Sequence, residues 1–192
     1  MKHHYDSISD AGQVQNGGTR SRGREVLSWA AWLLGAVVLA LLLRFFVFEI
    51  VIVKGPSMQP TLHTGQNVFI EKVSKRFDGG IDYGEIVVVH YPLEDEEIIK
   101  RVIGLPGDTI EVRDGLLYRN GARVEEPYLN EPLMSFDMDE VTVPEGHYFV
   151  MGDNRNESMD SRSASVGPIP EADVIGHALC IIWPVSEWKG LG

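Results

Sequence analysis

The chain has 192 residues, a formal net charge of −11 at pH 7 and 44% hydrophobic residues. This length suits one globular domain with a small additional segment and leaves no room for a second enzyme domain. The acidity argues against a nucleic-acid-binding surface, because phosphates are bound by clustered lysines and arginines. The single cysteine, Cys180, cannot form an internal disulfide, and the six histidines have no metal-ligand spacing, so we expect no metal ion and no cofactor.

The first 25 residues are polar, rich in glycine and serine, and predict a mobile tail. A run of 18 uncharged residues follows from Val26 to Leu43, and after Arg44 comes a second apolar group, FFVF. Because about 20 apolar residues span a bilayer, we predict a transmembrane helix over residues 26–46. It should be retained, since it ends in bulky residues and not in the small residues of a cleavage site. The alternative is a buried core helix.

Basic residues flank this helix unequally. Arg20, Arg22 and Arg24 precede it, whereas Arg44 and Lys54 follow it. The cytoplasmic flank of a membrane helix carries the excess of lysine and arginine. We therefore predict a single-pass protein of the plasma membrane, with residues 1–25 in the cytoplasm and residues 47–192 on the outer face.

The stretch Gly55–Thr61, GPSMQPT, follows the apolar helix closely. Its two prolines fix their own φ angles and keep the residue before each out of helical geometry. The hydroxyl of Ser57 should therefore be presented on a stiff turn. Taken alone, these residues are equally consistent with a surface turn that has no chemical role.

Short segments rich in β-branched residues follow, namely NVFIEKV, IVVVHY and IIKRVI, and they are typical of strands. Residues 109–124 contain Asp114-Gly115 and Asn120-Gly121, dipeptides that favour tight hairpin turns, and predict a β-ribbon. Residues 125–140 are acidic and interrupted by proline, which predicts a loop. HYFVMG and HALCIIW supply closing strands, the second of them buried. No amphipathic helix alternates with these segments, so we expect a mainly β, antiparallel fold.

Lys100 lies inside an apolar run that begins the stretch Ile98–Asp108, IIKRVIGLPGD. A serine hydroxyl needs a base near neutral pH, and a lysine serves only when it is unprotonated. Burial among apolar neighbours disfavours the ammonium form. Lowering the lysine pKa from about 10.4 to roughly 8 costs about 3 kcal/mol, which a folded domain tolerates. The alternative is an exposed strand lysine with Arg101 as its partner.

A third motif, MGDNRNESMDSR, extends from Met151 to Arg162. Together with PSMQPT and IIKRVIGLPGD it closely resembles the type I signal peptidases, membrane-anchored Ser-Lys proteases that remove signal peptides from exported proteins. The motifs occur in the family's order, and the resemblance covers the chain from the apolar segment to about Trp183. It implies a coiled antiparallel sheet, with Ser57 as the nucleophile and Lys100 as the general base.

The resemblance also implies residues that support this pair. Ser158 falls where the family has a serine that hydrogen-bonds the lysine. Asp160 falls where an aspartate supports the site together with an arginine, here Arg162. We expect Asp153 and Arg155, in the GDNR turn, to brace the loop and not to react.

The implied partners are the lipid bilayer and preproteins that carry a signal peptide. Cleavage after small residues requires shallow apolar pockets. By resemblance, Met58, Leu62 and Ile99 help to line them. Independently of the resemblance, we expect Ile50–Val53 to offer a strand edge to an extended substrate. The oligomeric state and the identity of the preproteins stay open.

Several alternatives also stay open. The expected oxyanion donor is the N–H of Ser57, but the second donor is undetermined because Gly55 stands where some family members have a hydroxyl. A triad based on His63, His90 or His147 lacks a GxSxG context. A self-cleaving repressor shares the Ser-Lys pair but would not need a membrane anchor. An anchored β module could bind exported chains without cutting them.

Overall fold

A computed structural model describes residues 22–73, 80–91 and 96–191. The chain divides into two units, residues 1–40 and residues 41–192, and each is described by itself. Residues 1–21 of the predicted mobile tail lie outside the described residues. Residues 22–25, which the sequence also assigns to the tail, belong to helix α1, which extends from Arg22 to Phe46. Arginine and glutamate are good helix formers, and Glu25 in the first turn complements the helix dipole.

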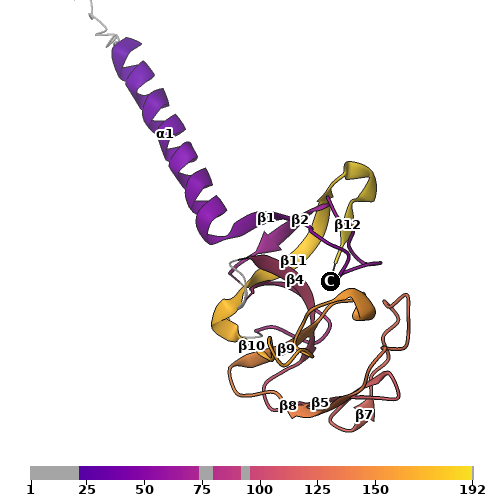
Figure 1. Cartoon of the computed structure of the whole chain (residues 1–192). Helices are drawn as coiled ribbons and strands as arrows, with labels where there is room; N and C mark the ends of the chain where they lie inside the picture. The colour runs from indigo at the N-terminus through magenta and orange to yellow at the C-terminus, as the bar shows by residue number, and fades with distance from the viewer. Residues whose placement is uncertain (1–21, 74–79, 92–95, 192) are drawn as a thin grey trace, which may run out of the picture. The chain divides into compact units, whose positions relative to one another are not determined.

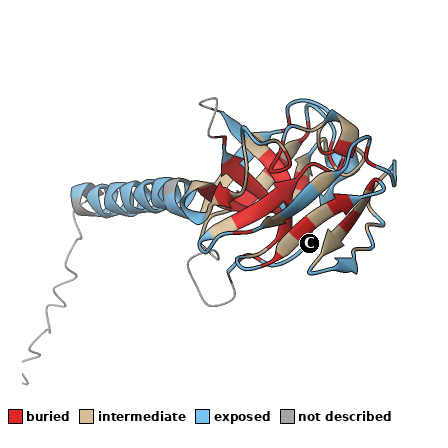
Figure 2. Cartoon of the chain, turned by 60° about the horizontal axis from the view of Figure 1, so that its bottom comes forward, coloured by how far each residue is buried: buried red, intermediate tan, exposed pale blue. Residues whose placement is uncertain are grey.

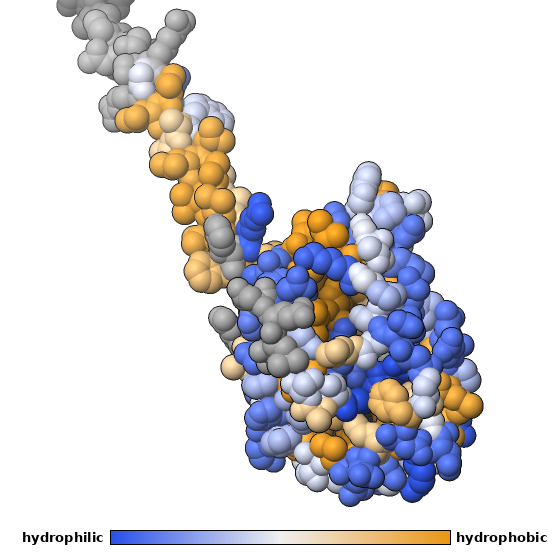
Figure 3. All heavy atoms as spheres, viewed as in Figure 1, coloured by the Kyte–Doolittle hydropathy of each residue, from blue (hydrophilic) through white to orange (hydrophobic). Residues whose placement is uncertain are grey.

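Within the described residues, α1 is the one helix long and apolar enough to cross a membrane. The segment Glu25–Arg44 has a mean hydropathy of 2.4, and none of it is buried in the protein. Figure 2 shows the helix exposed along its length, and Figure 3 shows that its surface is predominantly apolar. These properties do not fit the alternative of a buried core helix.

The larger of two sheets begins with β1, which follows the helix almost directly (Figure 1). Its strands pair in the order β1-β2-β11-β3-β4-β9-β10, and β12 pairs with β11. The strands of this sheet are β1 (Phe48–Ile52), β2 (Asn67–Glu71), β3 (Ile86–His90), β4 (Glu97–Gly104), β9 (His147–Met151), β10 (Ile169–Pro170), β11 (Val174–Trp183) and β12 (Lys189–Gly190). Short 3₁₀ helices connect some of them: η2 (Arg155–Glu157), η3 (Glu171–Asp173) and η4 (Val185–Glu187).

The smaller sheet has the order β7-β6-β5-β8. Its strands are β5 (Thr109–Arg113), β6 (Leu116–Arg119), β7 (Ala122–Arg123) and β8 (Met138–Thr142). Both predicted tight turns are present: Asp114 and Asn120 have φ of 52° and 54°, and the glycine after each also has a positive φ. The predicted loop 125–140 is wrong at its end, where β8 begins, because apolar Met138 faces Val112 of β5.

All pairings among the described strands are antiparallel. The mainly β, antiparallel fold class is thus confirmed, and the large sheet curls around a buried interior (Figures 1 and 2). Strand β11 is buried only in part, since Leu179 and Trp183 are 44% and 57% exposed. One apolar cluster, which includes Val53, Met58 and Ile99, packs beneath the turn that carries Ser57.

Candidate active site

The serine predicted as the nucleophile lies on the connection between β1 and β2. The backbone around it is fixed by two local hydrogen bonds, from Gln59 N–H to the Pro56 carbonyl (3.0 Å) and from Leu62 N–H to the Met58 carbonyl (2.8 Å). Gly55 precedes this turn with φ of 77°, a conformation that favours glycine. The Ser57 hydroxyl is therefore held on a short, ordered turn, as the two prolines predict.

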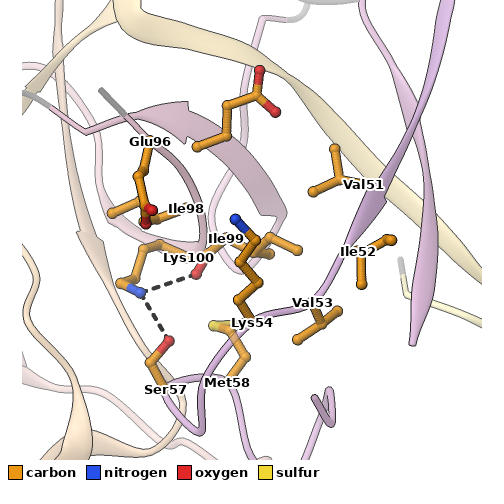
Figure 4. A pocket seen from close by; sticks show the side chains of 11 residues that line it. Val51, Ile52, Val53, Lys54, Ser57, Met58, Glu96, Ile98, Ile99 and Lys100 are labelled. Carbon is orange, nitrogen blue, oxygen red and sulfur yellow. Dashed lines mark hydrogen bonds between the residues drawn. The ribbon is translucent and has the colours of Figure 1, made fainter. Parts of the chain in front are cut away.

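The turn brings Ser57 to Lys100, which extends from β4. The Nζ atom of Lys100 lies 2.9 Å from Ser57 Oγ and 3.1 Å from the carbonyl oxygen of Ile99 (Figure 4). Lys100 is only 3% exposed. The alternative of an exposed strand lysine is therefore wrong, and so is its pairing with Arg101, which binds Asp153 instead.

The environment of Lys100 lowers the pKa of its amine from 10.5 to about 8. Burial is the main cause, because a low-dielectric surrounding disfavours the ammonium form. The carboxylates of Asp160 and Asp153 oppose this shift, and the guanidinium of Arg162 adds to it. A useful fraction of neutral amine, able to accept a proton, therefore exists at mildly alkaline pH.

A second turn, which follows β9, packs directly against the serine. Asn154 donates from its backbone N–H to the Ser57 carbonyl (2.9 Å) and from its side chain to the Pro56 carbonyl (3.2 Å). A Cβ atom on Gly152 would lie 2.5 Å from the Ser57 carbonyl oxygen and 2.3 Å from Ser158 Oγ. Only glycine allows these two turns to approach so closely.

Ser158, Asp160 and Arg162 form a connected group on the chain after this turn. Ser158 Oγ donates to Asp160 Oδ2 (2.7 Å), which also accepts the backbone N–H of Gly152 (2.9 Å). Arg162 donates from Nε to Asp160 Oδ1 and from Nη2 to Asp160 Oδ2, both at 2.8 Å. Among the described hydrogen bonds, Ser158 makes none to Lys100, which differs from the role that the resemblance implies. The buried carboxylate of Asp160 is the stronger acceptor for this hydroxyl.

A second buried ion pair, between Arg101 and Asp153, braces the site. The sequence predicts the bracing role of Asp153 but not its partner. Arg101 donates to both carboxylate oxygens of Asp153 (2.8 and 2.6 Å) and to the Gly84 carbonyl (2.6 Å). Asp153 also accepts the hydroxyl of Thr61 (2.5 Å). The bracing role expected for Asp153 fits this geometry. An arginine inside an apolar run signals that a partner is needed, but the sequence does not say which carboxylate provides it.

A small open pocket of about 70 Å³ lies beside the Ser57–Lys100 pair. Figure 4 shows Val51, Val53, Met58 and Ile99 among the side chains that line it, together with Lys54 and Glu96. Met58 and Ile99 line this pocket. Leu62 does not, because the local hydrogen bond to the Met58 carbonyl turns this residue inward and its side chain is completely buried in the core.

The other candidate groups lie elsewhere. None of His63, His90 and His147 lines the pocket of Ser57. Across the described ranges, no group of three or more histidine, cysteine, aspartate or glutamate side chains could hold a metal ion.

A family model and two relatives point to one family. The family model for the signal peptidases, peptidase S26, matches residues 26–183. Signal peptidase I of Bacillus licheniformis is 42% identical over 176 residues, which cover 87% of this chain and 94% of the relative. A probable signal peptidase I of Synechocystis is 45% identical over 168 residues, 83% of this chain and 84% of the relative. A crystal structure of a signal peptidase I from Enterococcus faecalis V583 is 38% identical and covers 50% of this chain and 95% of its own, with a TM-score of 0.45.

Proposed function

Because the chain belongs to the signal peptidase family, peptidase S26, we propose that it is a membrane-anchored serine endopeptidase in which Ser57 is the nucleophile and Lys100 the general base. The observation that carries this proposal is the contact between the two side chains, with Lys100 Nζ 2.9 Å from Ser57 Oγ and the lysine almost fully buried. Its substrates are preproteins whose signal peptide ends in small residues.

Acylation begins when the neutral amine of Lys100 accepts the proton of Ser57 as Oγ attacks the scissile carbonyl carbon. The tetrahedral oxyanion needs a hydrogen-bond donor. The backbone N–H of Ser57 is available, since it donates to no backbone carbonyl in the described part of the chain. When the C–N bond breaks, the Lys100 ammonium returns its proton to the departing amine. The signal peptide is then esterified to Ser57.

Deacylation uses the same base a second time. Lys100, neutral again, accepts a proton from water as the water oxygen attacks the ester carbonyl. The oxyanion collapses, the bond to Ser57 Oγ breaks, and the serine recovers its proton from the lysine. Asp160 and Arg162 support both steps from beneath, because their ion pair holds the chain at Gly152, which packs against Ser57.

Substrate binding follows from two strand edges beside the pocket. Strand β1 pairs only with β2 among the described strands, and β4 pairs with β9 only from Arg101 onward. An extended peptide can add its backbone to such edges. The pocket of about 70 Å³, lined by Met58 and Ile99, then accepts a small side chain and excludes a large one.

The cleavage assay uses the full chain, purified in detergent and incubated with a secretory precursor, and the new amino terminus is sequenced. We expect cleavage after a small residue by the native chain and none by Ser57→Ala or Lys100→Ala. Ser186→Ala and Lys189→Ala are matched controls, because both residues are exposed and lie in a chance SxxK sequence near the carboxyl end. Full processing by Ser57→Ala would refute the proposed nucleophile.

A further inference from the structure

A tyrosine outside the three motifs contacts the charged residues behind the dyad. Tyr128 lies in the segment after β7, which the sequence describes only as an acidic loop. Its ring covers the guanidinium of Arg101, whose Cζ atom is 4.0 Å from the ring centroid. Arg101 follows Lys100 directly in β4, and because side chains alternate along a strand, the contact is made on the opposite face of the strand from the base.

The contact continues to the serine turn through a short series of strong interactions. Arg101 uses three of its nitrogens, two on the Asp153 carboxylate and one on the Gly84 carbonyl. The side chain of Asp153 is fully buried and that of Arg101 is 9% exposed. Asp153 accepts the hydroxyl of Thr61, at the end of the GPSMQPT stretch. The orientation of Arg101 therefore bears directly on the turn that presents Ser57.

The same tyrosine also faces a second arginine. The Cζ atom of Arg155 is 6.0 Å from the ring centroid, and Arg155 Nε donates to the Gly152 carbonyl (3.1 Å). The Tyr128 hydroxyl donates to Glu126 (2.8 Å), which in turn accepts Arg155 Nη1 (2.7 Å). An aromatic ring attracts nearby guanidinium groups, so Tyr128 attracts both arginines. Tyr128 thus contacts the arginines that hold both turns beneath the dyad.

We propose that Tyr128 is a positioning residue for the Ser57–Lys100 dyad and acts through Arg101 and Asp153. This inference rests on the proposed function. Without the ring, water reaches the Arg101–Asp153 pair. The Arg101 guanidinium also loses the aromatic face that keeps it oriented toward the Asp153 carboxylate. The hold of Asp153 on Thr61 then loosens, and Ser57 departs from its reactive position.

The test compares Tyr128→Ala with Tyr118→Ala. Tyr118 is the matched control, because it is also half-buried and its ring also lies beside an arginine, with Arg113 Cζ 4.1 Å from the centroid, but on the smaller sheet. In Tyr128→Ala we expect kcat to fall about 10-fold to 100-fold with KM changed by less than about 2-fold. Tyr128→Phe keeps the ring on Arg101 and should restore most of kcat. Tyr118→Ala should leave both constants unchanged.

Hydrogen exchange gives a readout that needs no substrate. Tyr128→Ala should accelerate exchange of the Gln59 and Leu62 amides, which are bonded within the serine turn, and Tyr118→Ala should not. If Tyr128→Ala fails to fold, Tyr128→Leu replaces it, since leucine keeps apolar bulk but offers no π face. Any of three results would overturn the proposal. Exchange at both amides could be unchanged in Tyr128→Ala, kcat could fall equally in Tyr128→Ala and Tyr118→Ala, or kcat of Tyr128→Phe could be as low as that of Tyr128→Ala. A native chain that cleaves no precursor refutes only the proposed function, because exchange still reports the coupling.

Discussion

In the proposed mechanism, the charge of the Lys100 amine determines the pH at which the site can react. Its pKa of about 8 means that most molecules carry the ammonium form at neutral pH. We expect kcat/KM to rise about 10-fold per pH unit below pH 8 and to level off above it, as the neutral base accumulates. Initial rates on a peptide substrate from about pH 6 to about pH 10 measure this profile. An activity maximum near about pH 5 would contradict a lysine base.

The lowered pKa of Lys100 also makes the stability of the fold depend on pH. The pKa of Lys100 is lower in the folded state, about 8, than its ordinary value of 10.5. The unfolded chain therefore binds more protons between these values, and stability rises with pH across that window. Below about pH 8 the folded chain bears the full free-energy cost of burying the Lys100 ammonium, about 3 kcal/mol at 1.36 kcal/mol per pKa unit.

Replacing this lysine by an apolar residue of similar length should therefore stabilise the fold at low pH. We expect Lys100→Met to raise Tm at about pH 6 and the gain to shrink progressively between about pH 8 and about pH 10, because the folded-state lysine becomes neutral first and the unfolded-state lysine begins to lose its proton only near its ordinary pKa. Thermal unfolding in detergent at about pH 6 and about pH 10 measures this difference. Lys189→Met is the control, because Lys189 is exposed. A gain that grows with pH would show that burial does not lower the lysine pKa.

At the level of residues, the sequence is most informative where the signal is local. Ser57 between two prolines and Lys100 inside an apolar run each stand out without knowledge of any contact. The Arg101–Asp153 pair does not, because its members are 52 positions apart and the sequence contains many carboxylates. The sequence also does not show that Leu62 belongs to the core. The conformation of the turn, and not the residue type, decides whether its side chain faces a pocket or the core.

At the level of elements, the approach of two turns determines the geometry of the site. Gly152, after β9, has no room for a Cβ atom against the Ser57 carbonyl oxygen. We expect Gly152→Ala to separate the turns, to lower activity by about 100-fold and to lower Tm. Gly190→Ala is the matched control, because a Cβ there meets nothing within 4 Å. Cleavage assays and thermal unfolding of both variants test this, and native activity in Gly152→Ala would show that the close approach is not needed.

The elements themselves were predictable to different degrees. Asp-Gly and Asn-Gly specify their turns locally, so the two hairpins of residues 109–124 agree with the sequence. The order of the large sheet is not local, because β11 enters between β2 and β3 from far along the chain. The sequence predicts residues 138–140 as the end of a loop because the strand character of β8 comes from its pairing with β5.

At the level of the whole molecule, the exported location and the orientation are still proposals. The helix is long and apolar enough to span a bilayer. Three arginines (Arg20, Arg22 and Arg24) precede its apolar core, whereas Arg44 and Lys54 follow it. From the positive-inside rule we propose that the amino terminus is cytoplasmic and that the domain with Ser57 faces outward. This arrangement would place the dyad where the signal peptides of exported chains emerge.

Labelling with a membrane-impermeant maleimide on intact cells tests this orientation. In a Cys180→Ser background, Glu145→Cys places a thiol on an exposed turn between β8 and β9, and Ser7→Cys places one before the helix. We expect the first variant to be labelled on intact cells and the second only after permeabilisation, because the reagent does not cross the bilayer. The reverse pattern would put the Ser57–Lys100 site in the cytoplasm. Replacing Arg20, Arg22 and Arg24 by glutamate should weaken the preference for a cytoplasmic amino terminus, since these residues supply the excess positive charge on the amino-terminal side of the helix.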